Sequence, residues 1–413
     1  MIKILHTADW HIGQTFHEHD RSYEHQQFLN WLATTIAEQQ IDVLLMSGDV
    51  FDGSNPSAAS INLLYQFLAT VTRANPQLQV IITAGNHDSA ARLEAPNPFF
   101  EFYNIRIVGI MPRLGDGSFD HEKLLVPLKN KDGLIKAWCM AIPYLRPGDY
   151  PLVNGSNSVY ADGVTELYNQ SYAYAQSQQQ EGQAIIAMGH LHTLGAEKSG
   201  NDKNERLIMG GIEYIPSSAF DERIAYTALG HIHKAQMIGG RENVRYSGSP
   251  LPMSFTELNY IHQVIVFELE NEKAINIKQL EIPVTVALMR VPKIPKKLSE
   301  VLDELLLLPE AGQQIELAPY LEVRVLLEGP EPSLRHQIET ALTNKHVRFT
   351  KIEVSYPVGN QAEEAVLNFD QLQELAPIDV FNKIYKSRFD CVPPDEMIQL
   401  FNEVSLEVNC KEN

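Results

Sequence analysis

Five apolar stretches of this chain share one pattern, and this pattern constrains the fold more than any other feature. Each reads as a buried strand that runs directly into aspartate, asparagine or histidine. The five stretches are residues 2–11, 43–52, 80–88, 184–192 and 225–233. In all but the first, a glycine directly precedes the polar residue, as a tight turn at a strand end requires. Because α/β sheets place their chemistry at the carboxyl ends of core strands, we expect these polar side chains to converge.

Helical spacing separates the first three of these strands. Residues 23–39 and 58–71 each carry an apolar stripe of helical period, which gives a strand–helix–strand–helix–strand rhythm. That rhythm predicts an α/β layered core. Later strand candidates at 226–229, 244–247 and 263–269 suggest a second sheet. We therefore predict two sheets packed as a sandwich and flanked by helices.

The composition changes near residue 282, which suggests a domain boundary. A chain of 413 residues is expected to form about two or three domains. After the boundary, residues 284–356 read as strand–helix–strand–helix–strand, an order that suits a small ferredoxin-like α+β module. The remainder is acidic, with short amphipathic helices expected over 376–385 and 394–404. The predicted domains are 1–281, 282–357 and 358–413.

A short basic run lies just inside the second predicted domain. Its bases are Arg290, Lys293, Lys296 and Lys297, interrupted by two prolines. Contact with phosphate and an ordinary solvated linker explain this run equally well. The whole chain has a net charge of −19, which argues against a protein that coats nucleic acid but leaves room for a local basic groove. Metals or a partner would then supply much of the attraction for a phosphate.

Cysteine and hydropathy patterns bound the compartment and the metal chemistry. Three cysteines without a Cys-x-x-Cys pair exclude a disulfide framework and a zinc ribbon, so any metal must use oxygen and nitrogen ligands. No apolar run approaches the ~20 residues that span a bilayer. The N-terminus reaches Asp9 too soon for a signal peptide. We expect a soluble, cytoplasmic protein.

The polar residues at the strand ends form a mixed set of metal ligands. The candidates are Asp9, His11, Asp49, Asn86, His190, His231 and His233. Carboxylate, amide and imidazole together suit Mn²⁺, Fe²⁺ or Zn²⁺ better than Ca²⁺ or Mg²⁺. The set is too large for one open site and fits two metals, ~3.5–4 Å apart, that clamp a phosphate. Asp49, a short side chain at a sharp turn, is expected to face both ions.

Each motif alone has an ordinary structural explanation. A Gly-Asp pair after a strand is commonly just a turn, and Gly-His-x-His could be a hairpin tip. Gly-Asn-His-Asp is more specific, because three polar side chains at a buried strand end need partners.

The order of the motifs resembles that of the calcineurin-like metallophosphoesterases. This order is Asp-x-His, Gly-Asp-x-x-Asp, Gly-Asn-His-Asp, His and Gly-His-x-His. The segments 6–13, 85–89, 230–233 and 246–250 resemble more closely the SbcD family of nuclease subunits. The resemblance covers residues 1–270 through motifs and the rest through domain order. It implies the two-sheet metallophosphoesterase sandwich, a small α+β capping domain that engages DNA, and C-terminal helices.

The resemblance also implies a role for each residue of the site. Asp9, His11, Asp49 and His233 would bind the first metal. Asp49, Asn86, His190 and His231 would bind the second, and His190 is favoured over His192, two residues later. His87 would protonate the leaving oxygen or stabilise the transition state, and Asp52 would orient His87.

The function implied is a Mn²⁺-dependent DNA nuclease subunit. It would be a 3′-to-5′ exonuclease on duplex ends and an endonuclease on single strands and hairpins, acting in DNA end and palindrome processing. The chain has no Gly-x-x-x-x-Gly-Lys-Ser/Thr loop, so ATP dependence would come from a partner, the SbcC ATPase. The acidic C-terminal helices would dock this partner, and the family forms a dimer through the nuclease domain. The alternatives are a phosphodiesterase or phosphatase on small or nucleotide substrates, and a non-catalytic scaffold.

Overall fold

The computed structural model describes most of the chain up to residue 356. The described residues are 1–155, 158–197, 214–312, 315–329 and 331–356, followed only by 385, 393, 394, 397 and 398. The chain divides into two compact units, Met1–Ser355 and Tyr356–Asn413, and all the elements below belong to the first. Apart from those isolated positions, the helices predicted over 376–385 and 394–404 lie outside the described residues.

The first sheet has six strands in the order β14-β13-β1-β4-β5-β6. Their bounds are β1 Ile2–Thr7, β4 Val43–Ser47, β5 Gln79–Thr83, β6 Ile105–Val108, β13 Gln263–Glu270 and β14 Lys273–Glu281. Neighbouring strands in the part of the sheet formed by β1, β4, β5 and β6 are parallel. Every residue of β4 is buried, as expected of a central parallel strand covered on both faces.

The second sheet also has six strands, in the order β11-β12-β10-β9-β8-β7. Their bounds are β7 Leu125–Lys129, β8 Ile135–Ala141, β9 Ala184–His190, β10 Tyr226–Gly230, β11 Gln236–Ile238 and β12 Arg241–Tyr246. Strands β8, β9, β10 and β12 are parallel, so the carboxyl ends of β9 and β10 lie at the same edge.

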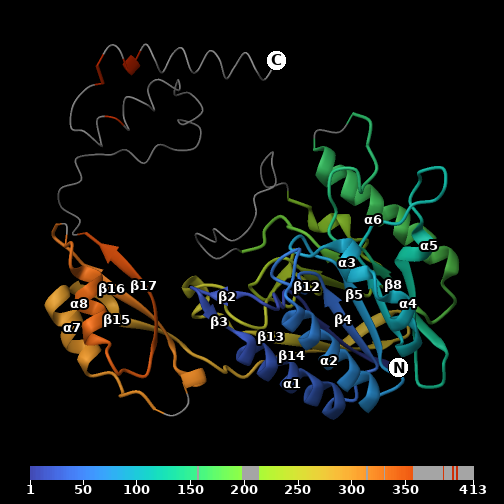
Figure 1. Cartoon of the computed structure of the whole chain (residues 1–413). Helices are drawn as coiled ribbons and strands as arrows, with labels where there is room; N and C mark the ends of the chain where they lie inside the picture. The colour runs from blue at the N-terminus through green and yellow to red at the C-terminus, as the bar shows by residue number, and fades with distance from the viewer. Residues whose placement is uncertain are drawn as a thin grey trace. The chain divides into compact units, whose positions relative to one another are not determined.

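Helices cover the first sheet on the side away from the second. α1 (Ser22–Glu38) and α2 (Ala58–Ala74) lie side by side (Figure 1) and pack their apolar stripes on β1, β4 and β5. The other face of these strands packs on β9 and β10, and α6 (Val159–Gln178) joins the same core. The predicted sandwich of two sheets flanked by helices is therefore confirmed.

Shorter elements complete this part of the chain. They are β2 Thr15–Phe16, β3 His19–Asp20, α3 Ala90–Glu94, α4 Asn97–Phe100, α5 His121–Leu124, and the 3₁₀ turns η1 Glu101–Tyr103, η2 Ser217–Ala219 and η3 Phe255–Glu257.

The strand predicted over 263–269 forms, but the expectation that it belongs to the second sheet is wrong. β13 pairs antiparallel with β1, so that Ile4 lies opposite Phe267. Both faces of β13 are apolar and mostly buried, so its sequence suits a central position in either sheet. Its placement depends on pairing with a segment about 260 residues earlier, which no local pattern encodes.

A smaller module follows, with the predicted order of elements. It comprises β15 Leu288–Lys297, α7 Leu298–Leu306, η4 Ile315–Leu317, β16 Tyr320–Leu326, α8 Leu334–Ala341 and β17 Arg348–Ser355. The strands pair in parallel in the order β15-β16-β17. A ferredoxin-like unit joins two consecutive strands without a helix between them, whereas within the described residues 288–355 a helix separates each strand from the next and all three strands are parallel, so the ferredoxin-like expectation is wrong. The unit remains a small sheet with two helices.

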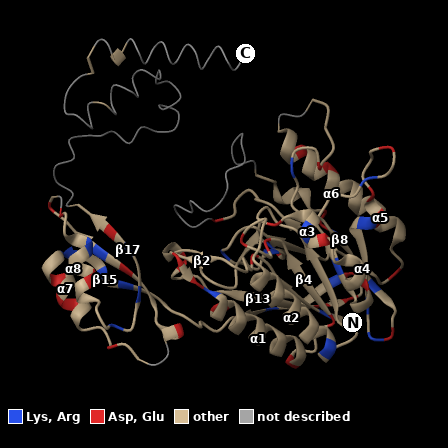
Figure 2. Ribbon diagram, viewed as in Figure 1, with Lys and Arg blue, Asp and Glu red and all other residues tan. Residues whose placement is uncertain are grey.

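The basic run forms strand β15, so its interpretation as a linker is wrong. The register of β15 against β16 shifts between Val291 and Lys296, the segment that holds the two prolines, as expected of a proline-containing edge strand. Arg290 pairs with Glu322, Lys296 with Glu304 and Lys297 with Glu328. Figure 2 shows acidic and basic residues interspersed over this module. Three of the four bases of the run are therefore paired with acids.

Among the described residues, no helix combines the length and the apolar character that crossing a bilayer requires.

Candidate metal centre

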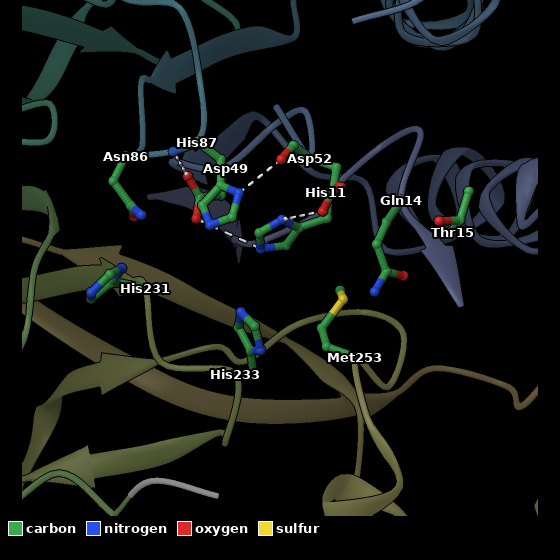
Figure 3. Close-up of a pocket in the computed structure, with 10 residues that line it drawn as sticks. All are labelled: His11, Gln14, Thr15, Asp49, Asp52, Asn86, His87, His231, His233 and Met253. Atoms are coloured by element: carbon green, nitrogen blue, oxygen red, sulfur yellow. Dashed lines mark hydrogen bonds and ion pairs between the residues drawn. The ribbon is translucent and has the colours of Figure 1, made fainter. Parts of the chain in front are cut away.

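The carboxyl ends of five strands, three from the first sheet and two from the second, meet at one edge of the sandwich. β1 leads to Asp9 and His11, β4 to Asp49 and Asp52, and β5 to Asn86 and His87. β9 ends at His190, and β10 leads to His231 and His233. Figure 3 shows seven of these nine side chains lining one pocket. Asp9 and His190 are buried 3.9 Å apart (Oδ1 to Nδ1), and His190 contacts the pocket wall through Asp49, whose Oδ2 lies 3.3 Å from His190 Nε2.

The backbone at this edge adopts conformations that side-chain-bearing residues rarely take. The φ angles of Asp9, His11, Asp49 and His231 are 56°, 47°, 52° and 98°. Each positive φ costs about 1–3 kcal/mol, and such conformations concentrate at functional sites. The loops therefore present these side chains in directions that an unstrained strand end would not provide.

The glycines that precede the ligands are required by close packing between the loops. A Cβ on Gly85 would lie 2.1 Å from Asp49 Oδ1, and one on Gly230 would lie 1.9 Å from the carbonyl oxygen of Ser47. Gly48 has φ +85°, and a Cβ there would lie 2.1 Å from His190 Nδ1. These glycines allow loops from both sheets to touch.

A first group of ligand atoms comes from Asp9, His11 and His233. One atom from each lies within 4.8 Å of the others. Asp9 Oδ2 and His11 Nε2 are buried without a hydrogen-bond partner. Buried polar atoms are normally paired, and here a carboxylate and an imidazole face one another with their bonding capacity unused. A divalent cation fits this group.

A second group comes from Asp49, His190 and His231, again within 4.8 Å. His190 Nε2 lies 3.3 Å from Asp49 Oδ2 and 2.9 Å from Asn86 Oδ1. Asp49 Oδ2 is also 3.6 Å from His11 Nε2, a member of the first group. The Asp49 carboxylate therefore faces both groups.

The second ring nitrogen of three histidines faces an acceptor outside the cluster. His190 Nδ1 donates to the carbonyl oxygen of Ser47 at 2.9 Å. His11 Nδ1 lies 3.3 Å from Asp52 Oδ1, and His233 Nδ1 lies 3.3 Å from Glu257 Oε1. This arrangement is typical of metal-binding histidines, because it fixes the ring and directs the other nitrogen at the ion.

The electrostatics of the cluster favour a positive charge between its carboxylates. Burial, reinforced by the neighbouring Asp49 carboxylate, raises the pKa of Asp9 against the lowering effect of the nearby histidines. Burial acts in the same direction on Asp49, but the neighbouring histidines, His190 foremost, hold the pKa of Asp49 well below its usual range. Against the effect of burial, Asp49 and Asp9 raise the pKa of His190 to about 9. Burial and neighbouring histidines keep the pKa of His231 well below its usual range, so its imidazole is neutral, the form that binds a metal.

His87 and Asp52 touch one another, but through different atoms than expected. His87 Nδ1 donates to the backbone carbonyl of Asp52 at 2.8 Å, while the Asp52 carboxylate lies beside His11. The backbone N–H of His87 donates to Asp49 Oδ1 at 2.9 Å. His87 is thus held by the loop after β4, and the Asp52 side chain faces the first group of ligands.

The histidine two residues after His190 lies outside both groups. His192 is buried, and its ring packs on His231 with a centroid separation of 3.9 Å. It extends the histidine cluster behind the second group.

Two buried carboxylates support the site, and the sequence analysis assigned a role to neither. Asp88 accepts from the backbone N–H of Val50, Phe51 and Gly85 at 2.9–3.1 Å. It directly follows His87, and a carboxylate at a buried strand end could have indicated this role. Glu257 lies 24 residues after His233 in a short turn, where no pattern distinguishes it from a surface acid.

Comparisons with known proteins agree with this geometry. The model of the calcineurin-like phosphoesterase family matches residues 2–235, and that of the type 5 capsule protein repressor C-terminal domain matches residues 284–389. The SbcD subunit of the SbcCD nuclease from Rhodobacter capsulatus is 35% identical over 363 residues, covering 86% of this chain and 88% of its own. Its namesake from Escherichia coli is 36% identical over 69% of each chain, and that from Bacillus subtilis is 27% identical over 98% of each.

The family model covers more than half of the chain, and two of these relatives exceed 30% identity over more than two thirds of their own length. The fold, the order of motifs and the clustering of carboxylates, asparagine and histidines at one edge are those of a divalent-metal phosphoesterase. This chain belongs to the calcineurin-like phosphoesterases and, among them, to the SbcD family of nuclease subunits.

Proposed function

We propose that this protein is the metal-dependent nuclease subunit of an SbcCD-type complex. It acts as a 3′-to-5′ exonuclease on duplex DNA ends and an endonuclease on single strands and hairpins. The observation that carries the proposal is the Asp49 carboxylate, which faces two adjacent groups of buried metal-ligand atoms. A pair of ions sharing one carboxylate is the arrangement suited to cleaving a phosphodiester by in-line displacement.

Seven side chains would hold the two ions. Asp9, His11, Asp49 and His233 hold the first, and Asp49, Asn86, His190 and His231 hold the second. The mixture of imidazole, carboxylate and amide favours Mn²⁺ over the all-oxygen preference of Mg²⁺ and Ca²⁺. When bound, the ions supply Lewis-acid polarisation of the phosphodiester and a nucleophile derived from water.

The chain's own residues orient the ligands and handle a proton. Hydrogen bonding of His87 Nδ1 to the carbonyl of Asp52 leaves Nε2 to protonate the leaving ribose oxygen or to stabilise the charge on it. The carboxylates of Asp52 and Glu257 and the carbonyl of Ser47 fix the rings of His11, His233 and His190. The proposed role of Asp52 is therefore double: its backbone orients His87 and its side chain orients His11.

We further propose the division into domains 1–281, 282–357 and 358–413, with the second domain engaging DNA and the third docking a partner. The name of the relatives points to that partner, the SbcC subunit, which would supply the ATPase. Pairing through the nuclease domain would form a homodimer. The free, buried thiol of Cys139 is compatible with a reducing compartment, and we place the activity in the cytoplasm.

Cleavage by a His87→Ala variant tests the proposal. With Mn²⁺, the wild type should degrade a linear duplex, and His87→Ala should lose about 10²–10⁴-fold in rate while still binding two Mn²⁺, measured by elemental analysis and anomalous scattering. Gln178→Ala, at the exposed end of α6 and outside both the pocket and the domain proposed to engage DNA, is the control. Cleavage that persists would remove His87 from the mechanism. Hydrolysis of p-nitrophenyl esters without degradation of DNA would rule out the nuclease assignment.

A further inference from the structure

Gln14 lines the pocket at the end opposite Asn86 (Figure 3). It follows His11 by three residues, and its backbone N–H donates to the His11 carbonyl at 2.9 Å, which closes a turn beside the first group of ligands. Its neighbours along the pocket wall are Thr15 and Met253. The metal chemistry leaves this part of the pocket without a function.

The orientation of the Gln14 amide is determined by its partner. Its Oε1 lies 2.7 Å from Nη1 of Arg21, and a guanidinium can only donate, so the atom facing Arg21 must be the amide oxygen. The NH₂ group is then directed away from Arg21. Among the described residues, no protein acceptor bonds to Gln14 Nε2. A neutral donor therefore faces the pocket.

Arg21 is held too firmly for this orientation to relax. Its side chain is fully buried, and Nε and Nη2 bind both oxygens of the buried Glu24 at 3.0 and 2.8 Å. Nη1 also donates to the carbonyl of Pro252 at 2.7 Å. A buried charge is tolerated only when it is paired and fully hydrogen-bonded, so movement of Arg21 would be costly.

The smaller module completes this network. The hydroxyl of Tyr320, on β16, donates to Glu24 Oε1 at 2.7 Å, and Arg348 Nη1 donates to the Tyr320 oxygen at 2.9 Å. Phe16, Phe255 and Val286 pack around the Tyr320 ring. The Gln14 amide is therefore fixed by groups from both the nuclease fold and the smaller module.

We propose that Gln14 Nε2 donates a hydrogen bond to a phosphate oxygen of the substrate strand that neighbours the scissile phosphate. The scissile phosphate would lie at the metal ligands, whereas Gln14 is at the far end of the pocket. Gln14 thus selects a substrate that continues beyond the bond to be cut, an oligonucleotide rather than a small ester, and Arg21 acts as its positioning residue. This inference rests on the proposed nuclease function.

Two substitutions at Gln14 test the proposal. Gln14→Glu keeps an oxygen acceptor for Arg21 and places a negative oxygen where the donor was. Gln14→Met keeps the size of the side chain and removes both polar groups. Gln178→Glu, at the exposed end of α6, repeats the charge change outside the pocket. Thermal unfolding and Mn²⁺ titration establish that each variant is folded and binds metal.

Two measurements carry the test. The first is binding of a fluorescent oligonucleotide duplex, by anisotropy, in EDTA. The second is the ratio of kcat/KM for DNA to kcat/KM for bis(4-nitrophenyl) phosphate with Mn²⁺. We expect both Gln14 variants to bind DNA about tenfold more weakly and to lower that ratio about tenfold, since each variant loses a hydrogen bond to a charged phosphate oxygen. Gln178→Glu should match the wild type.

Wild-type DNA affinity in Gln14→Met, or an equal loss of activity on DNA and on the small diester, would overturn the assignment of Gln14. A wild-type protein that hydrolyses the diester but does not cleave DNA would overturn the proposed function instead. The two failures are therefore distinguishable.

Discussion

At the scale of single residues, the orientation of each of three metal-site histidines depends on the acceptor that its second ring nitrogen faces. His190, His11 and His233 resemble one another in sequence, yet one rests on a carbonyl and two lie beside carboxylates. Glu257 is nearly fully buried and also accepts from the N–H of Met253 at 2.8 Å. Partners of this kind set the tautomer and the basicity of the ligand.

Removing the charge of Glu257 should weaken metal binding. In Glu257→Gln, the amide NH₂ group must replace one oxygen, so either His233 or the Met253 N–H loses its acceptor. Loss of such a partner typically costs 10–100-fold in metal affinity, and we expect a rise of about that size in the Kd for the weaker Mn²⁺, measured by isothermal titration. Glu181→Gln, on an exposed turn, is the control. Unchanged Mn²⁺ affinity would exclude this role for Glu257.

His6 should make the fold sensitive to mild acid. Burial, reinforced by Arg245, lowers the pKa of His6 from 6.5 to about 3. Between pH 6.5 and about 3, the unfolded chain therefore takes up a proton that the folded chain does not. Stability then falls with falling pH, by at most about 1.4 kcal/mol per pH unit. Urea unfolding at pH 7.5 and 5.5 should show a shallower loss for His6→Asn than for the wild type. Equal losses would show that His6 does not contribute.

At the scale of elements, the metal centre lies at an edge of the sandwich where hydrogen bonds join the loops that follow different strands. Asp88, after β5, binds three backbone N–H groups, two of them in the loop after β4. The glycines before the ligands allow those loops to approach within contact distance. The strands place the loops, and the buried carboxylate joins them.

Removing the Asp88 carboxylate should destabilise the loops after β4 and β5. Asp88→Ala leaves the N–H groups of Val50, Phe51 and Gly85 buried without an acceptor, and we expect the free energy of unfolding to fall by at least about 2 kcal/mol. Hydrogen exchange at these three amides should accelerate. Asp88→Asn, whose amide oxygen can still accept, should show a smaller effect. An Asp88→Ala protein with native exchange at these amides would contradict the role of Asp88.

At the scale of the first compact unit, the smaller module is joined to the nuclease fold by a buried polar contact within an apolar cluster. Tyr320 donates to Glu24, which Arg21 holds from the other side. Arg290 on β15 also donates to the carbonyl of Phe255, two residues before Glu257. The module therefore contacts the same segments that form one wall of the pocket.

Tyr320→Phe should weaken the contact between the smaller module and the nuclease fold without leaving a cavity. The ring still fills the apolar cluster, but Glu24 loses one donor, which should cost about 1–2 kcal/mol of unfolding free energy. Hydrogen exchange should rise in residues 14–24 and 250–258, and a double-mutant cycle with Glu24→Gln should give a non-zero coupling energy. Tyr356→Phe, on the exposed side chain that follows β17, is the control. Additive effects of the two substitutions would show that the contact does not couple the two parts.

The sequence by itself determined the local structure and most of the chemistry of the site. Apolar periodicity was enough for the strands and helices of the sandwich, since burial imposes it on each element separately. The polar residues at the strand ends, most of them after a turn glycine, and the family order of the motifs indicated the nine predicted side chains, which the structure brings to one edge of the sandwich. Local patterns succeed here because each motif is a strand end whose geometry is set by a few neighbouring residues.

The tertiary structure alone decided which distant segments meet. It placed β13 beside β1, arranged β15, β16 and β17 in parallel, turned the Asp52 carboxylate toward His11, and brought Glu257 to His233 and Tyr320 to Glu24. These pairings join residues that lie 24 to about 300 positions from one another in the sequence; the orientation of the Asp52 side chain is the exception in being a local feature. Their physical basis is complementary packing and hydrogen bonding in a buried interior, which no periodicity along the chain records.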